Sequence, residues 1–348
     1  MRYTVLIATY NRASHLRDTL RDLSRLTSPD PWEVLVVDNN SSDATRGVVI
    51  DEALRFPVDL RYLFEPVQGK PAALNSGIKA SRGEIICFID DDMRAEPDWL
   101  VRTGEAFDRF QCDYAAGKVL PIWLGEAPPW LSKRPSRQWG VIGVADYGPA
   151  HVPFGRRGLP PPMGGNMACR RDAFDRAGWW DNRFGRIGTS LRGQEQREWY
   201  LRACAAGLRG YYSPDMVTHH LIPADRLTKS YFRRWFYWSG ISRALLYDKL
   251  GIDMEAPDDS RLDFARVPHF VGVPRYMFRG ALKTAGRWIR RTAARDTAAA
   301  FDDELWMWFF AGVLRQRWKD RHRPPAFLSA GPVVLEPRDG QDRAPVGA

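Results

Sequence analysis

GEIICFIDDDM, residues 83–93, joins an apolar run to three consecutive aspartates. The apolar part, residues 85–89, has the length and composition of a buried β-strand. Asp90, Asp91 and Asp92 would repel one another and lose hydration at a strand end unless positive charge neutralises them. Mg²⁺ and Mn²⁺ take carboxylate oxygens as ligands, and ligands of open α/β sheets gather where the strands end. The run is therefore either an acidic loop or a divalent cation site.

Strand and helix patterns alternate along the first 120 residues. Strands are predicted over 3–8, 33–38, 59–65, 83–90 and 114–120. Helices are predicted over 14–26, over 42–55 with Ser42 as the cap, over 70–81, and from Pro97 to about 110. This alternation favours an α/β protein with a parallel sheet that helices cover on both faces.

The part beyond residue 120 is at first less regular. Residues 121–163 are rich in Pro, Gly, Trp and Arg without a clear period, as in a functional or mobile segment. A helix from about 194 to 206 is predicted to precede a pair of short strands over 207–220. From about 225 the pattern is helical and amphipathic, and the polar, Pro-rich tail from about 332 is expected to be disordered.

The composition is that of a basic globular protein. The 348 residues include 51 Lys and Arg against 42 Asp and Glu, a net charge of +9, which favours anionic partners such as phosphorylated substrates or anionic lipid. No zinc-finger, helix-turn-helix or RNA-binding signature is present, so nucleic acid is not expected as a partner. Four separated cysteines without a CxxC motif indicate free thiols in a reducing compartment, which predicts a cytoplasmic protein.

Membrane-targeting and membrane-spanning segments are not predicted. The opening MRYTVLIATYNR is too short and too polar after Ala8 for a signal peptide. The longest apolar run, LWMWFFAGVL (305–314), has about half of the ~20 residues that a spanning helix needs.

The turn after the first strand argues against a dehydrogenase. It reads ATYNRASHL (8–16) and lacks the GxGxxG of a dinucleotide-binding fold. Seven segments instead resemble, in their order and spacing, those of bacterial-type family 2 glycosyltransferases. They are ATYNR (8–12), VLVVDNNSSDAT (34–45), GKPAALNSGI (69–78), GEIICFIDDDM (83–93), GGNMACRR (164–171), EQREWYLR (195–202) and PDMVTHH (214–220).

The resemblance covers about residues 1–220 and implies the GT-A nucleotide-diphospho-sugar transferase fold, a Rossmann-like mixed sheet flanked by helices. Residues 1–222 would form the catalytic domain, with a nucleotide-binding part (1–120) and an acceptor-side part (121–222). A C-terminal amphipathic helical extension (223–331) would follow, and then the disordered tail (332–348).

The same resemblance implies an inverting, metal-dependent transferase in polysaccharide, glycolipid or secondary-metabolite synthesis. It would move a sugar from a nucleotide-diphosphate donor to a hydroxyl of a glycan, lipid or small-molecule acceptor. Mn²⁺ or Mg²⁺ would stabilise the negative charge that grows on the departing diphosphate. By its place in the family's Asp-x-Asp motif, Asp92 would be the principal metal ligand, and Asp90 or Asp91 would face the ribose or bind through water.

Further positions in the motifs are implied as contacts of the nucleotide sugar: Thr9, Asn11, Asp38, Lys70, Asn75, Gly165 and Asn166. Two of them have an ordinary structural alternative. Asp38 would accept a hydrogen bond from the base, or it forms only the turn before Asn39. Lys70 would contact the diphosphate beside the free amides of a helix start, or it is a solvated surface cation.

His219 and His220 lie where the resemblance places a C-terminal metal or phosphate ligand. In an extended chain adjacent side chains point to opposite faces, so only one of the two can reach the site. We prefer His219. The alternative for either residue is a packed or exposed polar histidine without a ligand role.

The catalytic base is the point where the chain departs from the family pattern. The family usually has Glu-Asp-x-Glu at this helix start, and the second residue is the base; here it would be Gln196, which cannot take a proton. A shift of one residue puts Glu195 in the base position. Glu195, Glu198 and Arg202 share one helix face, whereas Gln196 lies ~100° away. We predict that Glu195 deprotonates the acceptor hydroxyl and that Glu198 holds the geometry; the alternative for Glu195 is a helix-dipole role.

The C-terminal third combines aromatic and basic residues, most densely in RLTKSYFRRWFYWSGISRALLYDKLG (226–251). Such a helix packs on the catalytic domain, lies in a membrane interface where Arg contacts anionic lipid, or pairs into a homo-oligomer. We predict peripheral attachment to the inner face of the cell membrane through residues 226–323. Two other functions stay open: a non-catalytic binding or scaffold protein that kept the fold, and a nucleotidyltransferase, although the expected Gly-rich basic loop is lacking.

Overall fold

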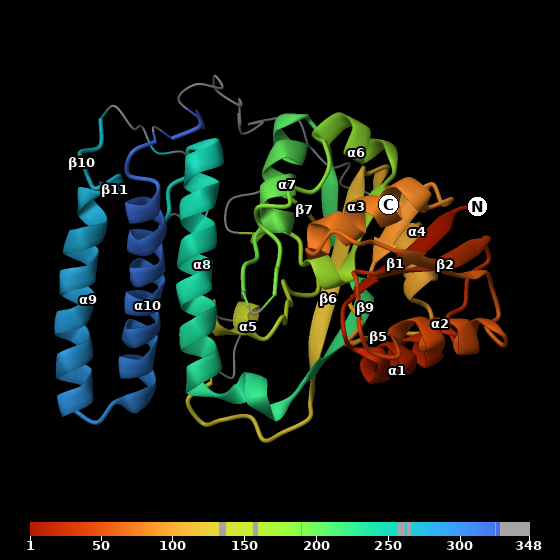
Figure 1. Ribbon diagram of the computed structural model, residues 1–348, viewed down its shortest axis with the longest axis horizontal. Helices are drawn as coiled ribbons and strands as arrows, with labels where there is room; N and C mark the ends of the chain where they lie inside the picture. The colour runs from red at the N-terminus through yellow and green to blue at the C-terminus, as the bar shows by residue number, and fades with distance from the viewer. Residues whose placement is uncertain are drawn as a thin grey trace, which may run out of the picture.

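The strands of the described residues form one mixed sheet of nine strands and one small hairpin (Figure 1). The computed structural model describes residues 1–131, 137–155, 159–188, 190–255, 262, 266–323 and 325–327. The tail predicted to be disordered, 332–348, lies outside them. The large sheet has the order β3-β2-β1-β4-β8-β6-β9-β5, and β7 pairs with β9.

The first four strands are parallel, as the alternating pattern predicts. They are β1 (Tyr3–Thr9), β2 (Trp32–Asp38), β3 (Leu60–Phe64) and β4 (Ile85–Phe88). The sheet is completed by β5 (Met93–Ala95), β6 (Tyr114–Trp123), β7 (Val152–Pro153), β8 (Met167–Arg170) and β9 (Gly210–Ile222), and the hairpin consists of β10 (His269–Phe270) and β11 (Val273–Pro274). Because β8 runs antiparallel to both β4 and β6, the sheet is mixed.

Alternate residues of the central strands face two hydrophobic cores. In β1, Val5 and Ile7 pack on the side of α1 (Ala13–Leu23), α2 (Thr45–Ala53) and α4 (Trp99–Phe110). Leu6 faces the opposite side, which is covered by α3 (Lys70–Ala80), α6 (Asp172–Ala177) and α7 (Glu195–Ala205). Because side chains alternate along a strand, both faces of the sheet are covered, as predicted.

Three local predictions differ from the structure. Ser42 does not cap α2, which begins at Thr45 without a side-chain cap. The two short strands predicted over 207–220 are the single strand β9, because its irregular part is absorbed by a register shift opposite Gly117. A Cβ at Gly117 would clash with the Met216 carbonyl, so the glycine makes room for this shift. The irregular stretch 121–163 contains β7 and a short helix, α5 (Arg137–Val141).

The C-terminal third forms three long helices that lie side by side (Figure 1): α8 (Lys229–Leu250), α9 (Arg275–Ala293) and α10 (Thr297–Lys319). Leu246 and Leu250 of α8 belong to the second core, so this helix packs on the large sheet and its helices. A Cβ on Gly240 or Gly312 would clash with the backbone where α8 and α10 touch. None of the described helices is long and apolar enough to cross a membrane.

Candidate active site

The candidate site lies at the carboxyl ends of the parallel strands. Thr9 ends β1 and pairs in register with Asp38 at the end of β2. On the other side of β1, β4 ends at Phe88 and leads directly into the acidic run. Because the ends of parallel strands meet at one edge of a sheet, the segments singled out in the sequence are brought together there.

Asp92 is buried between two arginines. It accepts hydrogen bonds from Arg12 Nη1 (2.8 Å) and from Arg226 Nη2 (2.9 Å). Arg226 lies in η2 (Ala224–Leu227), a 3₁₀ helix that follows β9. Burial alone would raise the pKa of Asp92, but His220, Arg226 and Arg12 lower it well below its usual range. The chain itself therefore supplies the positive charge that favours the anionic form of Asp92.

The other two aspartates have different partners. Asp91 accepts hydrogen bonds from the Thr9 hydroxyl (2.7 Å) and from Arg12 (2.9 Å). Burial raises the pKa of Asp91, although Arg12 opposes this. Asp90 accepts a hydrogen bond from Lys70 Nζ (2.5 Å). Each carboxylate of the run is thus paired with a cation from another part of the chain.

Lys70 is tied to the acidic run and is not a freely solvated cation. It begins α3 directly after Gly69, whose φ of 139° suits a glycine. Burial alone would lower the pKa of Lys70, but Asp90 and Glu195 raise it. Gly165 of η1 (Gly164–Asn166) lies close to the acidic run, because a Cβ there would clash with Met93 Sδ and lie 3.5 Å from Asp90 Oδ2.

Glu195 is a buried carboxylate with one unpaired oxygen among the described residues. It begins α7 and is only 4% exposed. Its Oε1 accepts a hydrogen bond from the Gln196 amide (2.8 Å), whereas its Oε2 is buried without a hydrogen-bond partner among the described residues. Burial raises the pKa of Glu195, and Lys70 opposes this only in part. A carboxylate with a raised pKa and a free oxygen is suited to accept a proton.

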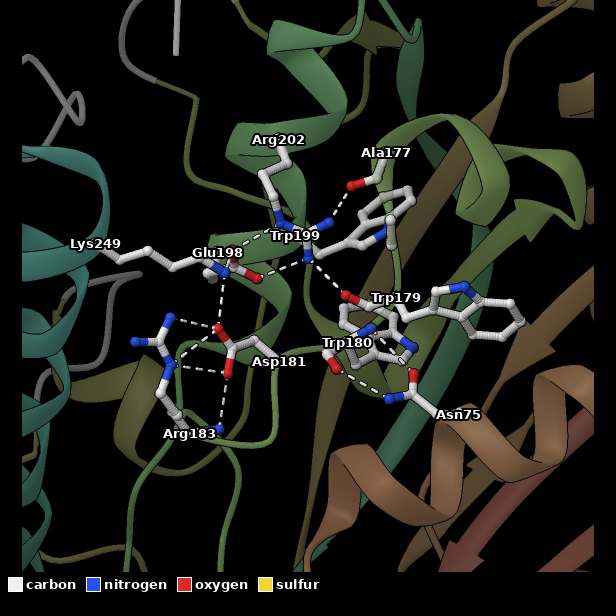
Figure 2. Close-up of polar contacts among 11 residues, drawn as sticks. Asn75, Ala177, Trp179, Trp180, Asp181, Arg183, Glu198, Trp199, Arg202 and Lys249 are labelled. Atoms are coloured by element: carbon white, nitrogen blue, oxygen red, sulfur yellow. Dashed lines mark hydrogen bonds and ion pairs between the residues drawn. The ribbon is translucent and has the colours of Figure 1, made fainter. Parts of the chain in front are cut away.

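Glu198 lies one turn further along α7 and has no exposed surface. Figure 2 shows that both of its oxygens are bonded: Arg202 donates to each of them (2.7 and 2.8 Å), and Lys249 Nζ donates to Oε1 (2.6 Å). Lys249 comes from α8 and also donates to Asp181 (2.7 Å). The cluster therefore ties the helix that carries Glu195 to the C-terminal helices.

Asn75 and Asn166 have backbone partners. The Asn75 amide donates to the Trp180 carbonyl (2.9 Å) and accepts from the Trp180 amide (3.0 Å), as Figure 2 shows. Asn166 is fully buried and donates to the carbonyls of Lys118 (2.7 Å) and Met216 (2.8 Å). Both side chains therefore help to hold the framework of the site.

Asp38 and Asn11 shape the loops at the sheet edge. Asp38 accepts hydrogen bonds from the Ser41 amide (2.9 Å) and the Tyr62 hydroxyl (2.8 Å). The bond from Ser41 is the one expected of a turn-forming aspartate. Asn11 has a φ of 51° and accepts from the Ser42 amide (2.7 Å).

The histidine beside the acidic run is His220, which corrects the preference for His219. His219 Nε2 lies 2.7 Å from a carboxylate oxygen of Glu96. His220 Nε2 lies 3.5 Å from Asp92 Oδ1, and its Nδ1 donates to the Ile142 carbonyl (2.6 Å). The two rings point to opposite faces of β9, and only the position of the strand within the sheet decides which face meets Asp92.

The donors of the acidic run fit a divalent ion only in part. Carboxylate oxygens are the ligands that Mg²⁺ and Mn²⁺ prefer, and one or two are enough when substrate phosphates complete the shell. Among the described residues, however, no three or more His, Cys, Asp or Glu side chains are placed to hold a metal ion. Arg12 and Arg226 already donate hydrogen bonds to the Asp92 carboxylate. The donor chemistry is suitable, and an ion at Asp92 would have to displace these arginines.

Sequence reasoning missed Arg12, Arg226 and Lys249. Arg12 lies in the ATYNR segment and could have been sought as the cation that adjacent aspartates need. Arg226 is 134 positions from Asp92, and Lys249 is 51 positions from Glu198. Such distant pairs leave no local signal in a single sequence.

Comparison with known proteins identifies the family. The profile described as "Glycosyl transferase family 2" matches residues 4–178. The glucosyl-dolichyl phosphate glucuronosyltransferase of Haloferax volcanii is 23% identical over 265 residues, 74% of this chain and 82% of that protein. Glycosyltransferase AglE of the same organism is 34% identical over 118 residues, 33% of this chain and 38% of that protein. Matches to some other relatives also span only about a third of their length.

The fold is shared with a solved structure, the mannosyltransferase PcManGT from Pyrobaculum calidifontis in complex with GDP-Man and Mn²⁺. The similarity covers 91% of this chain and 87% of that one, with a TM-score of 0.56 and 19% sequence identity. This likeness confirms the predicted GT-A fold. Since the family profile also matches half of the chain, the protein is a glycosyltransferase that belongs to glycosyl transferase family 2.

Proposed function

We propose that the protein inverts the anomeric carbon of a sugar as it moves that sugar from a nucleotide-diphosphate donor to a hydroxyl acceptor, with Glu195 as the base. The observation that carries this proposal is the buried Glu195 Oε2, which has no partner among the described residues. The acceptor hydroxyl gives its proton to Oε2, its oxygen bonds to the anomeric carbon, and the bond from that carbon to the diphosphate breaks. One displacement of this kind inverts the configuration.

Cations at the sheet edge support a diphosphate donor. Lys70, Arg12 and Arg226 reach the acidic run from three different elements, so positive charge is close to where the leaving diphosphate would gain negative charge. Mn²⁺ or Mg²⁺ held by Asp92 would add Lewis-acid stabilisation of that group. The GDP-Man and Mn²⁺ in PcManGT support this choice of donor and ion.

Ligand binding with and without Mn²⁺ tests the proposal. UDP, GDP, UDP-glucose, UDP-N-acetylglucosamine and GDP-mannose are compared by thermal shift in Mn²⁺ and in EDTA. A site ligand at 100 times its Kd stabilises the protein by about 2.7 kcal/mol. We expect a nucleotide to bind more tightly with Mn²⁺, and Asp92→Asn to remove that difference. If a nucleotide raises the melting temperature equally in Mn²⁺ and in EDTA, a divalent ion takes no part in its binding.

The same experiment separates the competing functions. A scaffold protein would bind no nucleotide and would hydrolyse no sugar nucleotide. A nucleotidyltransferase would release pyrophosphate from a nucleoside triphosphate. Asp92→Asn is checked for folding first, because it leaves Arg226 without its buried anion and Arg12 with Asp91 alone.

We also propose that the protein acts at the cytoplasmic face of a membrane through the outer face of α9. In its 19 residues α9 carries no Asp or Glu, and its cations are Arg275, Arg279, Lys283, Arg287, Arg290 and Arg291. Arg287 and Arg291 pair with Asp303 of α10. The other four have no acidic partner among the described residues.

Apolar side chains lie beside these cations. Leu282 and Ile289, seven residues apart and so on one side of the helix, are 75% and 60% exposed. A cationic helix with an exposed apolar stripe fits an anionic lipid surface. The relative named for glucosyl-dolichyl phosphate supports a lipid acceptor, and the free cysteines support a reducing compartment.

Co-sedimentation with vesicles tests this surface. Wild type is expected to bind phosphatidylglycerol vesicles more than phosphatidylcholine vesicles, and less in high salt. The pair Leu282→Asp and Ile289→Asp should remove binding, whereas Leu54→Asp, at an exposed residue after α2, should not. Unchanged binding of the double variant would exclude the surface. A dimer lost in the same variant, without vesicle binding in wild type, would identify a homo-oligomer contact.

A further inference from the structure

Trp180 has a buried polar group without a partner. Its side chain lines a small pocket beside the Lys70–Asp90 pair, together with Gln196 of the helix that carries Glu195. The residue is only 4% exposed, and its indole N–H has no acceptor among the described residues. An indole nitrogen only donates hydrogen bonds, so what it lacks is an acceptor, such as an oxygen of a ligand or of water.

Two neighbouring tryptophans show the usual arrangement. The indole of Trp99 donates to the side chain of Asn166 (2.8 Å), and that of Trp199 donates to the Gly178 carbonyl (3.0 Å). Trp199 lies in the same core as Trp180 and Trp99 in the core on the other face of the sheet, and both are fully buried. Because buried polar groups are normally paired, the unpaired donor of Trp180 stands out among the three.

Hydrogen bonds hold the backbone around Trp180 in place, and Figure 2 shows them. Asn75 holds its backbone amide and carbonyl. Arg202 donates to the carbonyls of Ala177 and Trp179 on either side of the turn. The indole ring packs edge-on against Phe88, with ring centroids 5.8 Å apart. A donor held in this way loses little freedom when a ligand binds.

We propose that the Trp180 indole N–H donates a hydrogen bond to a hydroxyl oxygen of the transferred sugar and thereby selects the sugar. This assignment rests on the proposed function and brings one hydroxyl of the sugar to the small pocket between Lys70–Asp90, which would lie toward the diphosphate, and the helix that carries Glu195. A sugar without an oxygen at that position leaves the indole donor unpaired, and sites built to hydrogen-bond a hydroxyl reject such analogues.

The assignment is tested by calorimetric titration of the protein with UDP and UDP-glucose, and with GDP and GDP-mannose. Trp180→Phe removes the N–H and keeps an aromatic ring. It should leave the affinity for the nucleoside diphosphate unchanged and weaken binding of the matching sugar nucleotide by roughly 10-fold. Trp199→Phe is the matched control, because it removes a paired N–H in contact with Trp180, and it should leave the ratio of the two affinities unchanged.

An unchanged affinity ratio in Trp180→Phe, or the same loss in Trp199→Phe, would overturn the assignment. If Trp180→Phe does not fold, monodeoxy analogues of the bound sugar nucleotide are titrated into wild type. One of them should then bind roughly 10-fold more weakly, and equal binding of all analogues would exclude the contact. If no nucleoside diphosphate binds wild type, the proposed function itself fails, and this assignment fails with it.

Discussion

Glu195 and Glu198 lie one turn apart on α7, and both are shielded from water, yet their surroundings are opposite. Glu198 is held by Arg202 and by Lys249 of α8. Glu195 has one amide partner, a free oxygen among the described residues and a pKa raised by burial. Because the two glutamates lie on the same helix, their difference comes from their hydrogen-bond and ion-pair partners. A carboxylate with an unpaired oxygen can accept a proton, whereas one held by cations stabilises the fold.

The largest expected effect comes from removing the available carboxylate. Glu195→Gln keeps the shape of the side chain but cannot accept a proton, so turnover should fall by roughly 10²–10⁴-fold, the usual contribution of a positioned base. Affinity for the nucleotide should stay nearly unchanged. Initial rates and calorimetry measure the two quantities. Glu195 is not the base if Glu195→Gln keeps the full rate while Glu198→Gln or Asp181→Asn loses it.

The second effect is on stability and belongs to the paired carboxylate. Glu198→Gln leaves Arg202 and Lys249 facing a neutral group, and breaking a buried ion pair in this way costs about 3–5 kcal/mol. Urea denaturation measures this change, and the rate per folded molecule should remain near that of wild type. A variant of normal stability with little turnover would instead place Glu198 in the chemistry.

The pH dependence of both rate and stability sharpens the contrast. Because burial raises the pKa of Glu195, turnover should fall with decreasing pH at a higher pH than for a free glutamate. Between the unfolded and the folded pKa the native state holds more protons, so the free energy of unfolding decreases as pH rises through this window. Asp91 adds a slope of the same sign and Asp92 one of the opposite sign, so the contribution of Glu195 is the difference between wild type and Glu195→Gln. The variant should have the more positive slope and the higher neutral-pH Tm, and equal slopes in the two proteins would contradict the raised pKa.

The smallest effect is expected for the cation that α8 contributes. Lys249→Met leaves Glu198 with Arg202 and Asp181 with Arg183, so the loss should be only about 1–3 kcal/mol, the usual value for lost charged hydrogen bonds. A double-mutant cycle with Asp181→Asn should give a coupling of about 0.5–3 kcal/mol. Strict additivity of the two substitutions would show that the contact contributes nothing.

Much of the fold could be predicted from the sequence, because it depends on local periodicity. The alternating apolar runs located β1 to β4 and α1 to α4, and the acidic run after β4 indicated the active edge. The contacts of Asn75 and Asn166 could not be predicted, because an amide in a binding motif has the same letter whether it contacts a ligand or a backbone carbonyl. The face of β9 that presents His220 depends on pairing with distant strands.

The hydrogen bond between Asp92 and Arg226 can form only late in the synthesis of the chain. The two residues are 134 positions apart, which at ribosomal speeds of about 5–20 residues per second corresponds to roughly 7–27 s of synthesis. During this interval the emerging sheet has Arg12 as the guanidinium partner of Asp92. We expect a ribosome-bound chain stalled before residue 226 to have a more anionic sheet edge than the full chain, because one of the two guanidinium partners of Asp92 has not yet been synthesised.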